Sequence, residues 1–319
     1  MSARVIRPSV YISKKLFKKK PLMHFNSKRI RTKFVAPESA NNIMTIERFF
    51  QLFLQELKIN PNLTRYYKYI NNKSSFQFRK AYFTQRLEYI QSHITDKNSV
   101  IWDCGCGFGT TAIFLALNGY KVAGNTIEFY YKEIPARLEY WSQYGDVSSF
   151  TPSYENAYEK RFEPLSIDYI IVQDTLHHLE PFQGILKIFK EVMKPHGKLI
   201  GIEENGNNII IRANRYRTRR SNRIIEIFDE RLNKKILFGN ENIRSFDTWQ
   251  KEFNKAGFVL KNKQYIRLFM PFFFNDTNAD NIIKTEQKLW QKNSFLREYF
   301  FFGLNFIAQL RQELGFPVK

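Results

Sequence analysis

The sequence predicts an α/β fold in which parallel strands form a sheet and helices cover both of its faces. Residues 99–109 read Ser-Val-Ile-Trp-Asp-Cys-Gly-Cys-Gly-Phe-Gly, an apolar strand that ends in an acid and continues into a loop with glycine at every second position. From residue 99 onward, strand-like and helix-like segments alternate, which is typical of a parallel sheet. Ligands of such sheets bind at the carboxyl ends of the strands, where this glycine loop lies.

The glycine loop has the properties of a ligand-binding loop. Gly105, Gly107 and Gly109 permit positive φ angles and let a ligand approach the backbone without meeting a Cβ. The apolar residues 110–117 predict a helix that Asn118-Gly119 closes, so its first N–H groups face the loop. A dinucleotide-binding loop needs a third glycine at position 110, where this chain has threonine, and NAD is therefore disfavoured.

Two helices are predicted ahead of the sheet. Residues 45–58 carry apolar side chains at helical spacing behind Thr45 as N-cap, and Pro61 ends this pattern. Residues 76–94 show helical spacing again and lead up to the first strand. We expect these helices to form a cap over the glycine loop.

Two later segments depart from the alternation of strands and helices. Residues 205–244 form an insertion, in which a short apolar strand at 209–211 precedes six arginines within residues 212–223, and we place it over the substrate side. Residues 271–319 are rich in aromatic side chains and predict a helical tail. The longest apolar stretch, 299–308, has about ten residues, which is too short to cross a bilayer but suits a position on its surface.

Four segments resemble the class I S-adenosylmethionine-dependent methyltransferases, in the family's order. Motif I, Asp-x-Gly-x-Gly-x-Gly, is carried by Asp103, Gly105, Gly107 and Gly109. Residues 168–179 are similar to the family's fourth strand and the Leu-His-His segment that follows it. Residues 192–203 resemble its Lys-Pro-Gly-Gly turn and fifth strand, with His196 in place of the first glycine of the turn. Residues 245–258 resemble the helix that ends in Ala-Gly-Phe before two antiparallel strands. The resemblance covers roughly residues 75–270.

The resemblance implies a Rossmann-like, seven-stranded mixed sheet with helices on both faces, and S-adenosyl-L-methionine as cofactor. The domain division that follows is a basic arm at 1–40, a helical cap at 41–97, a methyltransferase domain at 98–270 with its insertion at 205–244, and the C-terminal tail at 271–319.

The resemblance also assigns cofactor contacts to residues at the strand ends. Asp103 would orient the loop and the cofactor's ammonium group. Thr126 stands where the family usually has an acid that binds the ribose hydroxyls. Glu128 is then either the residue that binds the ribose or an acid at the start of a helix. Glu155 is either a contact of the adenine amino group or a surface acid. The predicted cofactor-binding residues are Asp103, Gly105, Cys106, Gly107, Gly109, Thr126, Glu128, Glu155, Gln173 and Asp174.

Candidate catalytic and substrate-binding residues follow the fourth and fifth strands. His177 and His178 are each either a general base or a residue that packs under the lid. Glu203 would bind a cationic substrate or orient a hydroxyl, and Arg212 and Arg215 would bind an anionic group. The acids suggest no metal site, so none is predicted, and Cys104 and Cys106, the only two cysteines, are expected to be reduced thiols.

The charge distribution indicates which kind of molecule accepts the methyl group. The net charge is +20, and residues 1–37 contain eleven lysines or arginines and no acid. Together with the aromatic tail, this charge favours transfer of a methyl group to a small hydrophobic or amphipathic acceptor, such as a lipid, quinone or polyketide, and oxygen is the preferred acceptor atom. The enzyme is then expected to be cytoplasmic and to contact an anionic membrane. One alternative is an RNA methyltransferase, although residues 173–176 lack the Asn/Asp-Pro-Pro-Tyr/Phe motif of amino-methylating enzymes. A non-catalytic binding module is the other, suggested by Thr126 and His196.

Overall fold

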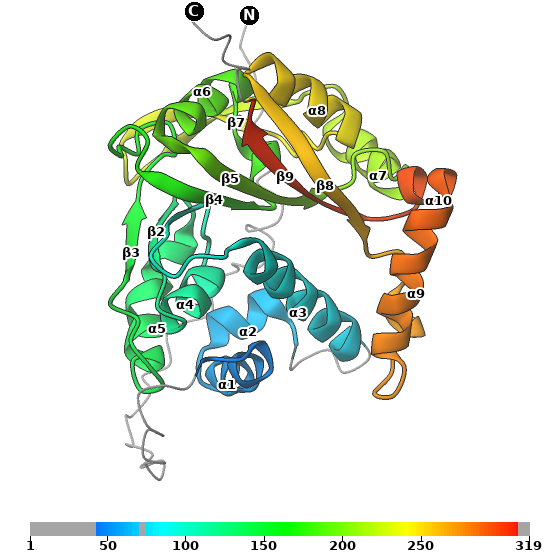
Figure 1. The fold of residues 1–319 in the computed structure, drawn as a ribbon, viewed down its shortest axis with the longest axis horizontal. Coiled ribbons are helices and arrows are strands. Elements are labelled where there is room, and N and C mark those ends of the chain that lie inside the picture. The colour runs from blue at the N-terminus through cyan, green and yellow to red at the C-terminus, as the bar shows by residue number, and fades with distance from the viewer. Residues whose placement is uncertain (1–42, 70–74, 312–319) are drawn as a thin grey trace, which may run out of the picture. The chain divides into compact units, whose positions relative to one another are not determined.

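A computed structural model describes residues 43–69 and 75–311, and a seven-stranded sheet lies at its centre (Figure 1). The strand order is β3-β2-β1-β4-β5-β9-β8. Strands β1 to β5 are parallel, whereas β9 is antiparallel to both β5 and β8. The strands are β1 Val100–Cys104, β2 Lys121–Thr126, β3 Phe150–Tyr154, β4 Ile167–Gln173, β5 Met193–Glu204, β8 Phe258–Ile266 and β9 Gly303–Leu310. The predicted mixed seven-stranded sheet is confirmed.

Helices pack on both faces of the sheet, as predicted (Figure 1). Successive strand residues point to opposite faces, so Ile101 belongs to one hydrophobic cluster and Trp102 to the other. The first cluster joins the sheet to the N-terminal helices, α4 Thr110–Leu117 and α5 Ile134–Trp141; the second joins it to α6 Phe182–Val192 and α8 Phe246–Lys255.

The N-terminal cap has one helix more than the sequence suggested. In α1 Ile46–Ile59, Thr45 is the N-cap and accepts a hydrogen bond from the backbone N–H of Arg48. Pro61, expected only to end that helix, is the first residue of a separate helix, α2 Pro61–Tyr67, because a proline at this position loses no helical hydrogen bond. Helix α3 Phe76–His93 follows. Helix α2 matters for function because it supplies two tyrosines to the site.

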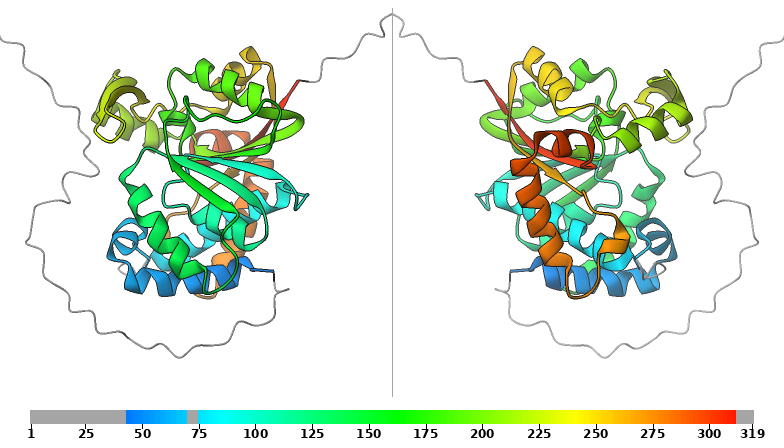
Figure 2. Two further views of the ribbon diagram at one scale, coloured as in Figure 1. Left: turned by 90° about the vertical axis from the view of Figure 1, so that its left-hand side faces the viewer. Right: turned by 90° about the vertical axis from the view of Figure 1, so that its right-hand side faces the viewer.

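The insertion at 205–244 is a helix and a hairpin, which stand beside the main sheet (Figure 2). The predicted strand at 209–211 is instead the start of helix α7 Ile209–Arg219, because Asn208 accepts hydrogen bonds from the N–H groups of Ile210 and Ile211. Strands β6 Ile224–Asp229 and β7 Lys234–Gly239 then pair as an antiparallel hairpin. No residue larger than glycine fits at Gly239, where a Cβ would lie 2.1 Å from the carbonyl oxygen of His177.

The C-terminal segment contributes a strand to the central sheet, whereas the sequence suggested a helical tail. Helices α9 Ala279–Lys292 and α10 Ser294–Tyr299 lead into β9, which lies between β5 and β8. Six of the eight residues of β9 are buried, so most of the apolar stretch 299–308 is sheet interior and not a membrane-facing surface. The fold domain therefore extends beyond residue 270 to Leu310. Within residues 43–69 and 75–311, no helix has the length and apolar character that a membrane span requires.

The basic arm predicted at residues 1–40 lies outside the described residues. Residues 43–69 and 75–311 belong to one compact unit, whose core connects the cap helices with the sheet.

Candidate functional site

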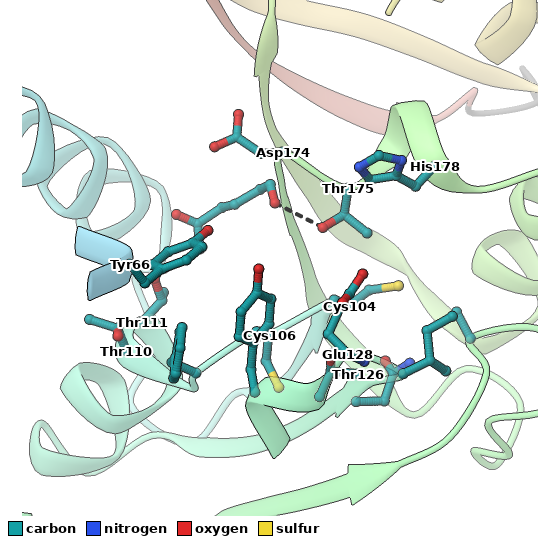
Figure 3. A pocket seen from close by; sticks show the side chains of 18 of the residues that line it. Tyr66, Cys104, Cys106, Thr110, Thr111, Thr126, Glu128, Asp174, Thr175 and His178 are labelled. Carbon is teal, nitrogen blue, oxygen red and sulfur yellow. Dashed lines mark hydrogen bonds between the residues drawn. The ribbon is translucent and has the colours of Figure 1, made fainter. Parts of the chain in front are cut away.

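A cavity of about 570 Å³ lies at the carboxyl ends of β1, β2 and β4 (Figure 3). The glycine loop and the ends of β2 and β3 form one wall of the cavity. Helices α2 and α3 and Arg267 contribute another, and the β6–β7 hairpin adds Ile236, Leu237 and Phe238. This is the strand edge where the sequence predicted the ligand.

The glycine loop adopts the backbone conformation that the sequence predicted. Gly105, Gly107 and Gly109 all have positive φ angles, of 81°, 55° and 73°. At Gly105 a Cβ would lie 2.4 Å from Cγ2 of Thr175, so close packing excludes any larger residue. At Gly107 the nearest atom to a Cβ is 3.9 Å away, on Tyr130, and this glycine lines the cavity. The open space at Gly107 is where a ligand can approach the backbone.

Asp103 lies at the end of β1 with only 1 % of its surface exposed. Its Oδ2 has no hydrogen-bond partner among the described residues. Burial raises the pKa of this carboxyl to about 7. A buried carboxylate oxygen without a donor, at the base of a ligand-binding loop, suits a ligand that brings a cationic N–H group.

A buried ion pair supports the loop from behind, and the sequence analysis missed it. Arg137 of α5 donates to both carboxylate oxygens of Glu56 at 2.7 and 2.8 Å. It also donates to the carbonyl oxygen of Phe108 and to Oγ1 of Thr110, each at 2.7 Å. Glu56 sits in an amphipathic helix pattern, where an acid normally marks the solvent face, so no sequence signal distinguished it.

Three predicted cofactor residues line the cavity at the ends of β2 and β3. Oγ1 of Thr126 accepts a hydrogen bond from the backbone N–H of Glu128, at 3.1 Å. Burial, and to a smaller extent the nearby Asp229 of the hairpin, raise the pKa of Glu128. The carboxylate of Glu155 forms an ion pair with Lys160 at 2.8 Å, and that hydrogen bond lowers its pKa. Glu155 therefore offers the cavity a carboxylate that is already paired.

Two further predicted residues, at the end of β4, line the cavity. Gln173 donates from Nε2 to Oγ1 of Thr111 at 2.8 Å. Asp174 has a left-handed backbone, with a φ of 48°, and its Oδ2 accepts from Arg86 of α3 at 2.7 Å. Burial raises the pKa of Asp174, but Arg86 and then Arg267 outweigh burial and keep it below its usual value. Its Oδ1 has no partner among the described residues.

His177, a candidate base, does not line the cavity. Its Nδ1 lies 2.5 Å from Oε2 of Glu203, and both side chains are buried. The other oxygen of Glu203 accepts hydrogen bonds from the backbone N–H groups of Thr175 and Leu176. The structure thus places Glu203 against the turn after β4 and His177 against Glu203. This agrees with the packing alternative for His177, and neither Glu203 nor His177 lines the cavity.

His178 does line the cavity, beside Thr175 (Figure 3). Its Nδ1 is 2.8 Å from the carbonyl oxygen of Gly239, which can only accept, so Nδ1 carries the proton. Burial, reinforced by the charge of His177, lowers the pKa of His178 to about 3. Its imidazole is therefore neutral, and its Nε2 accepts protons only weakly.

The two predicted substrate arginines lie away from the cavity. Arg212 is exposed on α7, and Arg215 forms ion pairs with Glu204 at 3.3 Å and Glu241 at 2.8 Å. Neither lines the cavity, because α7 begins after a loop that carries it to the side of the sheet. The arginines that do line it are Arg79, Arg86 and Arg267.

The aromatic side of the cavity is a second feature that was not predicted from the sequence. Tyr66 and Tyr67 come from α2, and Tyr130 comes from the 3-10 helix Phe129–Glu133 that follows β2. Burial raises the pKa of Tyr66, and it raises that of Tyr130 to about 12, so both phenols stay protonated. Tyr66 and Tyr67 reach the cavity because α2 folds over the loop, and the spacing of residues in the sequence does not reveal this contact.

Metal and thiol chemistry find little support in this part of the chain. The described residues include no group of three or more His, Cys, Asp or Glu side chains arranged to hold a metal ion. Cys104 and Cys106 are free thiols, and burial raises the pKa of both.

Comparisons with known proteins agree with this architecture. A family described as "Methyltransferase domain" matches residues 102–201. No curated protein matches the chain significantly in sequence. A Galdieria sulphuraria protein, described as a candidate sarcosine dimethylglycine methyltransferase, aligns in structure with a TM-score of 0.50 at 14 % identity, covering 73 % of this chain and 88 % of its own.

A second similar structure is phosphoethanolamine N-methyltransferase 2 of Haemonchus contortus, solved with S-adenosyl-L-methionine, with a TM-score of 0.49 at 15 % identity. The alignment covers 72 % of this chain and about half, 52 %, of the Haemonchus protein. At such identities the structural likeness concerns the fold. Residues 102–201 thus match a methyltransferase domain, and the strand order and the glycine loop after β1 agree with that match.

Proposed function

We propose that this chain binds S-adenosylmethionine in the cavity and transfers its methyl group to a small amphipathic acceptor. The observation that carries the proposal is that Gly107 opens onto the same cavity that Tyr66 and Arg86 close from the cap. One cavity therefore offers a bare backbone for a cofactor and a separate aromatic and charged wall for a second molecule.

The described residues fit the cofactor at several points. The orphaned Oδ2 of Asp103 suits its ammonium group, because that oxygen has no donor of its own. Thr126 and Glu128 line the cavity near the end of β2, and we assign the ribose hydroxyls to them. Glu155, already paired with Lys160, retains carboxylate oxygens that can accept from an adenine amino group. When bound, S-adenosylmethionine supplies an electrophilic methyl group on a sulfonium.

The chain contributes positioning more than proton transfer. His178 has a pKa of about 3, and Tyr66 and Tyr130 hold their protons, so these groups do not serve as bases near neutral pH. A nucleophile that arrives with a free lone pair needs no base, and in-line alignment and exclusion of water then supply the rate. Oxygen, the acceptor atom that the sequence favours, suits this cavity as a carboxylate or phenolate.

The cofactor proposal is tested by calorimetric titration with S-adenosylhomocysteine. We compare Gly107→Leu with Gly119→Leu, because both glycines have positive φ and room for a Cβ, but only Gly107 lines the cavity. We expect Gly107→Leu to weaken binding at least tenfold and Gly119→Leu to leave it within twofold. Equal loss in both variants, or no binding by the unmodified chain, would contradict the proposal.

A transfer assay with S-adenosylmethionine labelled on its methyl group then tests catalysis. Lipid extracts, quinones, aromatic acids and RNA are offered separately. Label in a small-molecule fraction supports the proposal, and label in RNA supports the RNA methyltransferase instead. Binding of the cofactor without transfer to any fraction would favour the non-catalytic module.

A second candidate function is contact with an anionic membrane through α7. Ile209, Ile210 and Tyr216 are exposed on this helix, Tyr216 by 74 %, together with the exposed Arg212 and Arg217. Exposed apolar side chains among arginines favour binding at a lipid interface. Vesicles with and without phosphatidylglycerol test it: binding to anionic vesicles alone, reduced in Arg212→Ser/Arg217→Ser, supports this contact, and equal binding to both opposes it.

A further inference from the structure

We propose that Arg86 and Arg267 form an anion-binding subsite that holds a carboxylate or phosphate group of the methyl acceptor. This inference rests on the proposed function, because it gives the chemical class of the second molecule in the same cavity. Both arginines line the cavity, from α3 and from the residue that follows β8. Figure 3 shows the neighbouring Asp174 on the side of the cavity opposite Thr126 and Glu128.

The charges of this wall do not balance. Asp174 is 2.7 Å from Arg86 and compensates it. The guanidinium of Arg267 forms no ion pair with any described residue. Its Nη2 donates a hydrogen bond to the carbonyl oxygen of Phe302 at 3.3 Å, and its buried Nε has no partner among the described residues. An arginine does not lose its proton in a protein, so one positive charge remains unpaired at the cavity wall.

Two other carboxylates near Arg267, those of Glu204 and Glu286, form no ion pair with it; Oε2 of Glu286 has no hydrogen-bond partner among the described residues, but burial raises the pKa of Glu286 and so favours its neutral form. Glu204 pairs with Arg215 at 3.3 Å. Glu286 of α9 is buried and accepts from the hydroxyl of Tyr82 and from the backbone N–H groups of Leu268 and Phe269. Arg267 is partly buried, and a partly buried guanidinium without an ion-pair partner is unfavourable. An anionic group of a ligand in the cavity would supply the missing partner.

The backbone holds Arg267 in this position at some cost. Arg267 and Asp174 have φ angles of 64° and 48°, in the left-handed region that residues other than glycine seldom occupy. The carbonyl oxygen of Arg267 accepts from the N–H of Phe302, and Glu286 fixes the two residues that follow Arg267. Strained residues held by several surrounding contacts gather at ligand sites, which agrees with a built subsite.

Aromatic side chains lie beside the two arginines and indicate the rest of the acceptor's structure. Tyr66, Tyr69, Phe78 and Phe83 line the same cavity as the two arginines. The wall therefore suits a small organic anion with an apolar or aromatic body, a more specific class than an amphipathic acceptor. Arginine binds both carboxylate and phosphate through paired N–H groups, so the wall itself admits either.

The test uses four probes that share one aromatic ring: benzoate, phenyl phosphate, neutral benzamide and cationic benzylamine. Each is titrated by calorimetry into the full chain with and without saturating S-adenosylhomocysteine. We expect benzoate or phenyl phosphate to bind at least tenfold more tightly than benzamide, and benzylamine to bind most weakly. The stronger of the two anions identifies carboxylate or phosphate as the group recognised.

Variants assign the anion preference to the subsite. Arg267→Met should weaken binding of the preferred anion at least tenfold and leave the affinity for S-adenosylhomocysteine within twofold. Arg212→Met, which removes the same charge from the exposed surface of α7, should change neither. Arg267→Lys keeps the charge and should retain part of the anion affinity, which preserves the test if the methionine variant does not fold.

The outcomes separate this inference from the proposed function. Equal affinities for benzoate, phenyl phosphate and benzamide, or unchanged anion binding in Arg267→Met, would overturn the subsite even if S-adenosylhomocysteine binds. Anion binding that depends on Arg267 in a chain that does not bind S-adenosylhomocysteine would overturn the cofactor proposal and leave the subsite standing.

Discussion

Replacing Arg137 by methionine should destabilise the fold more than any change at a surface ion pair. Arg137 donates two hydrogen bonds to Glu56, one to the carbonyl oxygen of Phe108 and one to Thr110. The side chains of Arg137 and Glu56 are buried, with 0 % and 2 % exposed. The substitution leaves the Glu56 carboxylate in the interior with Trp141 Nε1, at 3.0 Å, as its remaining donor among the described residues.

The magnitude follows from what is left unpaired. Removing one partner of a buried ion pair costs about 3–5 kcal/mol, and the two lost charge-assisted hydrogen bonds, at about 1.5–3 kcal/mol each, give a similar figure. We therefore expect Arg137→Met to lower the free energy of unfolding by about 4 kcal/mol. For a domain of this size, that corresponds to a fall in Tm of about 8–16 °C.

Urea denaturation and calorimetry of three variants measure this effect. Glu56→Leu should cost about as much as Arg137→Met, whereas the double variant should cost no more than either single one, because no charge is then left alone. The exposed pair of Lys80 and Glu47, 3.0 Å apart, is the control, and Glu47→Gln should cost only a few tenths of a kcal/mol. Strictly additive effects of the two buried substitutions would refute the reasoning.

Three further predictions concern the loop and the strand ends. Gly105→Ala should lose about 2 kcal/mol more in urea denaturation than Gly107→Ala, because both adopt positive φ but only the first places its Cβ 2.4 Å from another side chain; equal losses would contradict this. Burial lowers the pKa of His177, but Glu203 outweighs it and raises this pKa from 6.5 to about 9. The stabilisation is therefore complete below pH 6.5 and lost as the pH rises through about 9, and the pH dependence of unfolding over that range should flatten in His177→Gln; an unchanged slope would count against the pair. Because the pKa of Asp103 is raised to about 7, affinity for S-adenosylhomocysteine should rise roughly tenfold from pH 6 to pH 8 in calorimetry and become nearly independent of pH in Asp103→Asn; a pH dependence shared by both proteins would show that another group is responsible.

The parts of the fold that the sequence predicted are those that local chemistry specifies. The apolar strand that ends at Asp103 and the helix over Thr110–Leu117 appear where the residue pattern placed them. Ser245 caps α8 because its hydroxyl accepts the backbone N–H of Thr248, as expected for a helix that starts there. In each case the residues that define the element are adjacent in the chain.

Elements whose position depends on distant partners were not predicted. The order of strands places β9 between β5 and β8, although residues 267–302 separate it from β8 along the chain. An apolar stretch such as 299–308 is compatible with a strand, a buried helix or a surface segment until the elements that pack against it are known. Arg86 and Arg267 face one cavity for the same reason: tertiary packing, not spacing, brings α3 to the end of β8.

The histidine pair shows how a motif can lie at the site and yet act indirectly. His177 and His178 are adjacent, but His177 binds Glu203 and only His178 lines the cavity. Glu203 holds the N–H groups of Thr175 and Leu176, and Thr175 packs so closely on the glycine loop that Gly105 admits no Cβ. The carboxylate that the sequence assigned to a substrate is thus connected, through one turn, to the loop that we assign to the cofactor. Loss of the Glu203 side chain should therefore displace the glycine loop and weaken cofactor binding. Slower methyl transfer would follow from that weaker binding.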